Sequence, residues 1–474
     1  MGRRLVSLLA VGLLSCAGSE GADGRVLRGA EQPVPESTTL TDVQAEAVLY
    51  GLLTPGGDAG WAAVAAAIAQ ADDRRFVAPL VDLLRFREQA HVGDLLEQLT
   101  GEELGTDWPA WVEWLGPNPQ GTPPGYAAWK GATLALATDD AAFRRFLNPE
   151  TGATVRLDEV VWGGVGVDAI PALENPPTTA DGSWLQADDL IAGVLLGGQA
   201  RAYPLRIINW HEMVNDVVGG VPVSLAYCTL CGSAVLYGTA GPDGPRTFGS
   251  SGLLMRSNKL MFDRQSDTLW NQLTGEPVVG PGAGGEPLPM LPVVIETWAE
   301  WSRRHPDTDV LSEQTGHDRD YGPGRSYGDY FASATTMFPV WKRKSLLPAK
   351  ERIFAMRDGP LSKAWPLSAL PSGAVLNDAL GPQPVVLLVG RDDPATDEPG
   401  GRSVRAYARG TQRFEATDRV GIVRVDGADW AVTEAALLGP RGESLERLPG
   451  HVAYWFGWFA FFPQTEVFGV PAAP

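Results

Sequence analysis

The chain has 474 residues and a formal net charge of −19. A surface of this sign repels nucleic acid and anionic lipid, so the composition disfavours a nucleic-acid partner. The length suggests two or three domains, and 44% hydrophobic residues are enough to build a core in each of them.

The first residues predict export. Two arginines precede a ten-residue apolar run, Leu5–Leu14, which is too short to cross a bilayer and is typical of a secretory signal. The sequence Leu13–Cys16 resembles the site at which lipoprotein signals are cut before the new N-terminal cysteine is acylated. We therefore expect residues 1–15 to be removed and Cys16 to anchor the protein to a membrane of the cell envelope, periplasmic or on the outer surface. The alternative is an ordinary secreted protein in which Cys16 is discarded with the signal.

A tether and a helical module are predicted next. Residues 16–39 are rich in Gly, Ser, Glu and Pro and have no apolar period, which indicates a lipidated N-terminus and a flexible tether. Residues 40–148 predict a helical module, because Trp61–Gln70 and Phe76–Arg87 carry apolar residues at helical spacing. Thr41 is a candidate cap for the first helix.

Residues 149–474 predict a mainly β domain. Short β-type runs recur, among them Leu190–Leu196 and Val385–Val389, and Gly and Pro separate them. In Val221–Tyr227 apolar residues alternate, as in a strand with one buried face. A short helix is expected near residues 297–304. The fold class is therefore α+β: a small α-helical N-terminal module followed by a large mainly β domain, of sandwich or barrel type.

The thiol chemistry of the mature chain is confined to one place. The sequence has three cysteines, and if Cys16 is lipidated only Cys228 and Cys231 remain. Cys-x-x-Cys-Gly is the sequence of a metal knuckle, in which two thiolates converge on one ion and Gly232 permits a positive φ. A catalytic dithiol and a structural disulfide remain open as alternatives, since cysteine pairs of exported proteins usually oxidise.

Further ligands for a metal ion would have to be His, Met or carboxylate, because no second cysteine pair exists. His211 is the histidine close upstream of the cysteines, and Met261 offers a thioether downstream. Two thiolates, an imidazole and a thioether form a soft donor set that favours copper, although zinc or iron would also accept the thiolates and the imidazole. The alternatives are a hydrogen-bonded polar histidine and a methionine that fills the core.

An ordered string of motifs runs through the predicted β domain. Its segments are Arg156–Gly164, Ala202–Leu205, Trp210–Asp216, Pro222–Ser224, Tyr227–Ser233, Gly252–Leu254, Asn258–Gln265, Leu269–Gln272, Gly275–Gly280 and Trp455–Glu466. The string resembles a bacterial and archaeal family of exported proteins and lipoproteins that is known only as a domain of unknown function, built around Tyr-Cys-x-Leu-Cys-Gly-Ser.

The resemblance implies that His211, Cys228, Cys231 and Met261 belong to one shared set of motifs, but it names no ion. The chain departs from the family pattern at Thr229, where proline is usual, and at the residue before Asp263, where tyrosine is usual. Neither departure touches a predicted ligand.

From these observations we expect an envelope lipoprotein with a soft metal site for copper. It would handle metal or transfer electrons, and it would exchange the metal or the electrons with a protein partner. One alternative is a thiol–disulfide oxidoreductase that uses Cys228 and Cys231. Another is a non-catalytic binding module in which the pair forms a structural disulfide. Whether the protein is an enzyme is left open.

Overall fold

The computed structural model describes residues 39–53, 57–86, 89–340, 342–343, 345–391 and 402–470. The predicted signal peptide and Cys16 lie outside the described residues, as does the predicted tether up to residue 38. The described residues belong to one compact unit. Within them, no helix combines the length and the apolar character that a membrane span requires.

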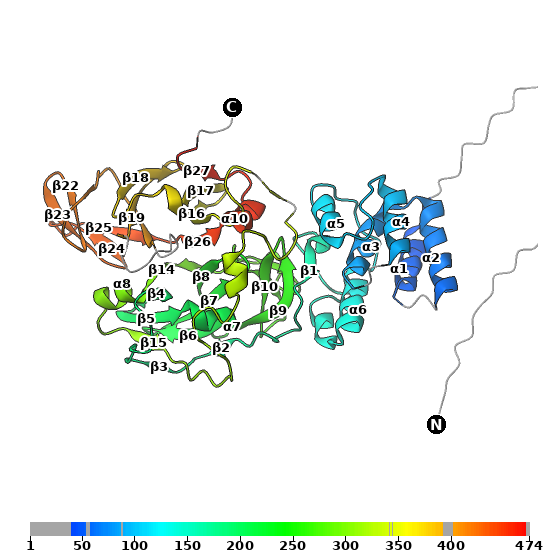
Figure 1. The fold of residues 1–474 in the computed structure, drawn as a ribbon, viewed down its shortest axis with the longest axis horizontal. Helices are drawn as coiled ribbons and strands as arrows, with labels where there is room; N and C mark the ends of the chain where they lie inside the picture. The colour runs from blue at the N-terminus through cyan, green and yellow to red at the C-terminus, as the bar shows by residue number, and fades with distance from the viewer. Residues whose placement is uncertain are drawn as a thin grey trace, which may run out of the picture. The chain divides into compact units, whose positions relative to one another are not determined.

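The predicted fold class is confirmed. A small helical region precedes a large mainly β domain that contains a half-barrel and a nearly closed barrel (Figure 1). Thr41 caps the first helix as predicted, because its hydroxyl accepts a hydrogen bond from the Gln44 N–H. The α-helices are α1 (Asp42–Gly51), α2 (Asp58–Ala71), α3 (Val77–Leu84), α4 (Ala90–Thr100), α5 (Trp108–Leu115), α6 (Tyr126–Thr138), α7 (Leu205–His211), α8 (Trp298–Arg304), α9 (Gly328–Ala332) and α10 (Trp455–Phe461).

Three five-stranded sheets form the first part of the β domain. In spatial order they are β1 (Val160–Trp162), β9 (Phe248–Met255), β10 (Asn258–Asp263), β11 (Leu269–Asn271) and β12 (Pro277–Val279); then β13 (Met290–Leu291), β8 (Ser233–Gly238), β7 (Val221–Cys228), β6 (Met213–Val218) and β2 (Leu173–Glu174); then β14 (Val294–Thr297), β4 (Leu190–Leu196), β5 (Gln199–Pro204), β15 (Asp309–Leu311) and β3 (Thr178–Thr179).

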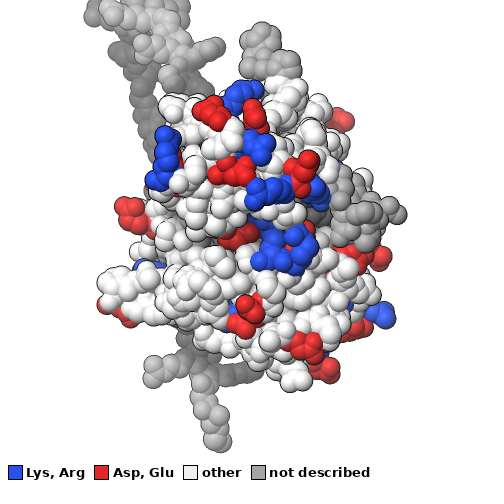
Figure 2. Space-filling model, turned by 90° about the vertical axis from the view of Figure 1, so that its left-hand side faces the viewer, with Lys and Arg blue, Asp and Glu red and all other residues white. Residues whose placement is uncertain are grey.

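Two further sheets form the second part. The first contains β26 (His451–Tyr454), β16 (Arg352–Asp358), β17 (Leu361–Pro366) and β27 (Glu466–Val467). The second contains β18 (Val375–Leu380), β19 (Gln383–Val389), β20 (Val404–Ala408), β25 (Ser444–Leu448), β24 (Ala436–Leu438), β23 (Ala428–Val432), β22 (Ile422–Val425) and β21 (Glu415–Ala416). Acidic and basic side chains mix on the end of the molecule where α8, β22 and β23 lie (Figure 2).

The prediction that β7 has one buried face is wrong, because this strand is buried on both faces. From Val223 to Cys228 every residue is buried. Leu225 and Tyr227 face one apolar cluster, whereas Ala226 belongs to another on the opposite side of the sheet. The small Ser224 and Ala226 look polar or neutral in the sequence, but they fit the tight packing of the second face.

One arrangement of strands occurs twice in the β domain. In the first copy β14 runs antiparallel to β4, β4 pairs with β5, and β15 runs parallel to β5. In the second copy β26, β16, β17 and β27 pair in the same order and with the same directions. We name residues 190–311 repeat 1 and residues 352–467 repeat 2.

A buried carboxylate at the same place in each repeat supports this correspondence. In repeat 1, Asp216 accepts hydrogen bonds from Arg201 and from Tyr203, both at 2.7 Å and 15 and 13 residues away. In repeat 2, Asp378 accepts them from Lys363 at 2.9 Å and Trp365 at 2.8 Å, with the same separations of 15 and 13 residues. The residue types differ, but in both repeats a cationic side chain and an aromatic side chain donate to the carboxylate from the same positions in the sequence.

Two more contacts repeat in the same way. The indole N–H of Trp301 donates to Thr308 at 2.9 Å, and that of Trp458 donates to Thr465 at 2.8 Å, seven residues away in both cases. The side chain of Asn215 both accepts from and donates to the backbone of Phe248. Asn377 makes the same pair of bonds with the backbone of Phe414. The β domain is therefore built from two copies of one fold.

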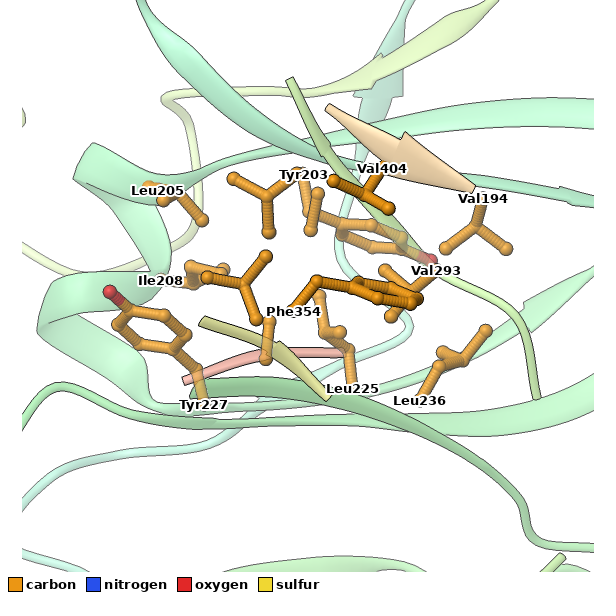
Figure 3. Close-up of a cluster of buried hydrophobic side chains, with 14 of the residues drawn as sticks. Val194, Tyr203, Leu205, Ile208, Leu225, Tyr227, Leu236, Val293, Phe354 and Val404 are labelled. Atoms are coloured by element: carbon orange, nitrogen blue, oxygen red, sulfur yellow. The ribbon is translucent and has the colours of Figure 1, made fainter. Parts of the chain in front are cut away.

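The repeats share their largest apolar core. Figure 3 shows side chains of repeat 1, such as Tyr203 and Leu225, packed around Phe354, which β16 of repeat 2 contributes. Val404 of β20 joins the same cluster. The apolar surface that each repeat buries is therefore in part the surface of the other.

Replacing Asp216 by alanine should lower the free energy of unfolding by about 3 kcal/mol, because the buried Arg201 and Tyr203 would lose their shared acceptor. Urea denaturation followed by circular dichroism measures the change. Asp307→Ala is the matched control, since Asp307 is exposed, and it should leave the midpoint almost unchanged. Equal midpoints for both variants would show that the buried carboxylate does not support the fold.

Candidate functional site

The two cysteines lie in a tight turn between paired strands. β7 ends at Cys228, which is the cross-strand partner of Ser233 at the start of β8. Inside the turn the Cys231 N–H donates to the Cys228 carbonyl at 3.2 Å. Gly232 has a φ of +56°, in the left-handed region that favours glycine. The turn therefore brings both sulfur atoms to one place, where both thiols are free.

The Cys228 sulfur lies among hydrogen-bond donors. The Cys231 thiol and the backbone N–H groups of Lys259 and Cys231 donate toward it. Burial alone would raise the pKa of Cys228, but these donors favour the thiolate and leave the pKa below its usual value. Of the two cysteines, Cys228 is thus the one whose surroundings stabilise the negative charge of a thiolate.

Cys231 has the opposite character. Burial raises its pKa well above the usual value, and the neighbouring Cys228 raises it further because a second thiolate would stand beside the first. Its thiol also reaches the Ser257 carbonyl at 3.3 Å. Asn258 donates weakly to the Cys231 sulfur at 3.6 Å and strongly to Gln272 at 2.8 Å. The two cysteines are therefore chemically different despite their proximity.

A buried ion pair lies beside the turn. Glu212 follows α7 and contacts the Lys259 ammonium group at 2.9 Å, and its other carboxylate oxygen accepts from Thr229 at 3.0 Å. The Glu212 carbonyl accepts from the Tyr227 N–H at 2.7 Å. Glu212 thereby ties the segment after α7 to the cysteine turn.

Sequence analysis missed Glu212, Lys259 and Gln272 as parts of this site. All three stand in the motif segments that carry the family resemblance, and Glu212 directly follows His211, which was selected for its affinity for metal. The signal was therefore present in the string, but a ligand-based interpretation favours sulfur and imidazole over carboxylate, ammonium and amide.

His211 is bound elsewhere. Burial lowers its pKa to about 4, so the ring is neutral at neutral pH. Its Nδ1 lies 2.8 Å from the Pro171 carbonyl, which can only accept, so Nδ1 carries the proton. Nε2 is then the acceptor for the Tyr321 hydroxyl at 2.6 Å. Both ring nitrogens are thus used in hydrogen bonds, and the lone pair of Nε2 faces Tyr321.

Met261 also lies apart from the cysteines. It is fully buried in an apolar cluster with Met213 and Trp270. Cys228 and Cys231 belong to a different cluster. Among the residues that the structure describes, no three His, Cys, Asp or Glu side chains gather as a metal site would require. Of the four predicted ligands, the structure brings together the two cysteines.

Repeat 2 covers the cysteine turn. Gly457 of α10 packs against Cys231 so closely that an added Cβ would lie 3.0 Å from the sulfur. The Tyr454 N–H donates to the Cys231 carbonyl at 2.7 Å, and the Tyr454 ring lies against Gly232. Outside repeat 2, the Tyr330 hydroxyl donates to the Leu230 carbonyl at 2.6 Å. The exposed fractions are 1% for Cys228 and 0% for Cys231, so the pair is almost completely shielded from solvent.

A cavity of about 630 Å³ adjoins this cover. Tyr227 and Gly232, the residues that flank the two cysteines in sequence, line it from repeat 1. Arg352 and Tyr454 line it from repeat 2. This volume suits a small molecule or an extended peptide segment. Neither Cys228 nor Cys231 is among the described residues that line it.

Comparison with known proteins gives a family but no function. No curated protein matches the chain, and no solved structure does. A model of one protein family matches residues 167–465, a continuous stretch that includes repeat 1 and repeat 2 as far as residue 465. The motif segments that carry the sequence resemblance lie within residues 156–280 and 455–466, so the matched region also includes the stretch between them. The chain belongs to the family described as protein of unknown function DUF3179.

Proposed function

We propose that Cys228 and Cys231 form a redox-active dithiol that exchanges with disulfides. The observation that carries the proposal is the asymmetry of the pair: Cys228 is surrounded by donors that favour a thiolate, whereas Cys231 keeps its proton. A thiolate attacks, and a second thiol within reach resolves the product. On this proposal the cysteine motif is the functional centre of the family.

The exchange consists of two substitutions at sulfur. The Cys228 thiolate attacks a disulfide R–S–S–R′, the S–S bond breaks, and R′S⁻ leaves and takes the proton of Cys231. The Cys231 thiolate then attacks the Cys228 sulfur in the mixed disulfide and releases RS⁻. The protein ends as a disulfide, and the substrate disulfide is reduced to two thiols by two electrons.

The cavity of about 630 Å³ favours a small or extended disulfide over a folded protein as the reactant. Because neither sulfur is exposed, contact requires the Tyr454 ring to move away from Gly232. Gly232 tolerates the change, since no side chain of its own blocks the path.

A second candidate keeps the copper that the sequence predicts but changes its ligands. The pair of soft sulfur donors and the amide N–H groups directed at Cys228 are the features of a metal knuckle. Copper(I) is soft enough to be held by two thiolates, without the His211 and Met261 of the predicted set. In this case the protein would store copper or pass it to a partner.

Reaction of the reduced protein with a small aromatic disulfide should distinguish the steps. In a Cys16→Ser background, the intact pair should release two equivalents of coloured thiol per chain and end as a disulfide. Cys231→Ser should release one equivalent and keep one aromatic thiol as a mixed disulfide, visible by mass spectrometry. Met261→Leu is the matched control and should behave as the parent.

Two outcomes would contradict the dithiol proposal. One is a release of coloured thiol that Cys228→Ser leaves unchanged. The other is a cysteine pair that does not react with the aromatic disulfide after full reduction.

Elemental analysis of protein purified from the envelope tests the second candidate, copper binding. Copper at one equivalent, lost in Cys228→Ser and kept in His211→Gln, would favour copper handling.

The pH at which the Cys228 thiolate forms tests the role of its donors. In the Cys16→Ser background, the thiolate absorbance should appear below the usual pKa of about 8.5. Cys231→Ala removes one donor and should move the midpoint to higher pH, whereas Cys231→Ser keeps a hydroxyl donor and should move it less. A midpoint that stays fixed in Cys231→Ala would show that the pair does not share its proton.

Export and lipid anchoring remain part of the proposal and rest on the sequence of residues 1–16. If Cys16 is acylated, Cys16→Ser should move the protein from the membrane fraction to the soluble fraction and abolish incorporation of labelled fatty acid. Cys228→Ser is the control and should stay in the membrane fraction. A soluble parent protein would instead indicate an ordinary secreted protein.

A further inference from the structure

The position of the cysteine turn in repeat 1 has a counterpart in repeat 2. In repeat 1 Asp216 pairs with Val223 across the β6–β7 hairpin, and Cys228 ends β7. In repeat 2 Asp378 pairs with Val385 across β18–β19 in the same register. Counted from these pairs, Gly390 stands where Cys228 stands in repeat 1.

The covering helices correspond as well. Gly457, which packs against Cys231, directly precedes Trp458 in α10. The residue that directly precedes the equivalent Trp301 in α8 is Glu300. Gly390 and Glu300 line one common pocket. This pocket therefore occupies, in repeat 2, the place of the cysteine pair.

The pocket has a volume of about 120 Å³ and a lining rich in arginine. Its lining arginines are Arg303, Arg304, Arg391, Arg405 and Arg419. Glu300 is the carboxylate that lines it among the described residues. Basic side chains lie on this end of the molecule, with acidic ones among them, where α8, β22 and β23 lie (Figure 2).

The ion pairs among the residues that line the pocket leave a net positive charge there. Glu300 bonds to both Arg303 and Arg304, so one carboxylate serves two guanidinium groups. Arg419 shares Asp429 with Arg424, and Arg405 is paired with Glu296 and Glu434. In the part of the chain that the structure describes, the one hydrogen bond of the Arg391 side chain goes to the uncharged Thr417 carbonyl, at 3.1 Å. Arg391 is thus a pocket-lining guanidinium group without a carboxylate partner among the described residues, in a chain whose net charge is −19.

We infer that the arginine-lined pocket of repeat 2 binds a small oxyanion of the phosphate or sulfate type. The planar guanidinium fork matches such an anion with two parallel hydrogen bonds. The volume of about 120 Å³ fits a single tetrahedral group and excludes a nucleotide. The buried Arg405 side chain and the backbone of β19 close the inner end of the pocket.

Titration calorimetry with inorganic phosphate and, separately, with sodium sulfate tests the site on the Cys16→Ser chain. We expect saturable binding of one anion per chain by at least one of the two salts. Arg391→Ala should weaken the binding roughly tenfold or more, since a charge-assisted hydrogen bond is lost. Arg441→Ala is the matched control: Arg441 is exposed and paired with Glu443, and its loss should not change the affinity.

Heat that rises without saturation, or binding that Arg391→Ala leaves unchanged, would overturn the inference. Anion binding in this pocket does not depend on the proposed redox function. Cys228→Ser should therefore leave the anion affinity unchanged. Failure of the dithiol experiments would thus leave this site intact, and the reverse also holds.

Discussion

Each repeat of the β domain closes the end of the other with a helix, and both candidate sites depend on this crossed packing. α10 of repeat 2 carries Gly457 to the sulfur of Cys231 in repeat 1. α8 of repeat 1 carries Glu300 and its arginines to the end of β19 in repeat 2. The strands that lead into these helices cross in the same way, since β26 contacts β8 and β14 contacts β20. Neither site is complete within one repeat, so the repeats must fold as one unit.

Burial under α10 determines the chemistry of the cysteines. In an apolar cluster a thiolate is unfavourable unless donors replace the lost water. The amides of Lys259 and Cys231 supply such donors to Cys228, and backbone amides in a paired strand and a tight turn cannot move away from it. Cys231 receives one weak side-chain donor, from Asn258. The difference between the two thiols thus arises from the hydrogen bond that the Cys231 thiol donates to Cys228 and from these two amides.

Local patterns predicted the elements well. The Thr41 cap, the run Leu190–Leu196 and the helix before Arg304 all formed where expected, because each depends on neighbours within a few residues. The one-sided burial of β7 was wrong, because a second sheet covers its other face and no local pattern encodes that. For the candidate site, the sequence predicted the meeting of Cys228 and Cys231, which the turn alone determines.

Distant contacts could not be predicted in this way. The partners of His211 lie 40 and 110 residues away, at Pro171 and Tyr321, and they commit both ring nitrogens to hydrogen bonds. The repetition escaped notice for a related reason: Arg201 and Lys363, or Tyr203 and Trp365, share a role toward a carboxylate without sharing a residue type. A role of this kind is defined by its acceptor, which only the fold brings near.

The two ends of the β domain also show how one arrangement accommodates different chemistry. Where the helix contributes Gly457, which has no side chain, the hairpin contributes two sulfur atoms and fills the space completely. Where the hairpin contributes Gly390, the helix contributes the longer Glu300, and arginines surround a hollow instead of a packed interior. Close packing allows a large residue on one side only if the other side is small. A side chain at residue 457 would therefore displace Cys231, whereas a side chain at residue 390 would first meet Ser403 of repeat 2.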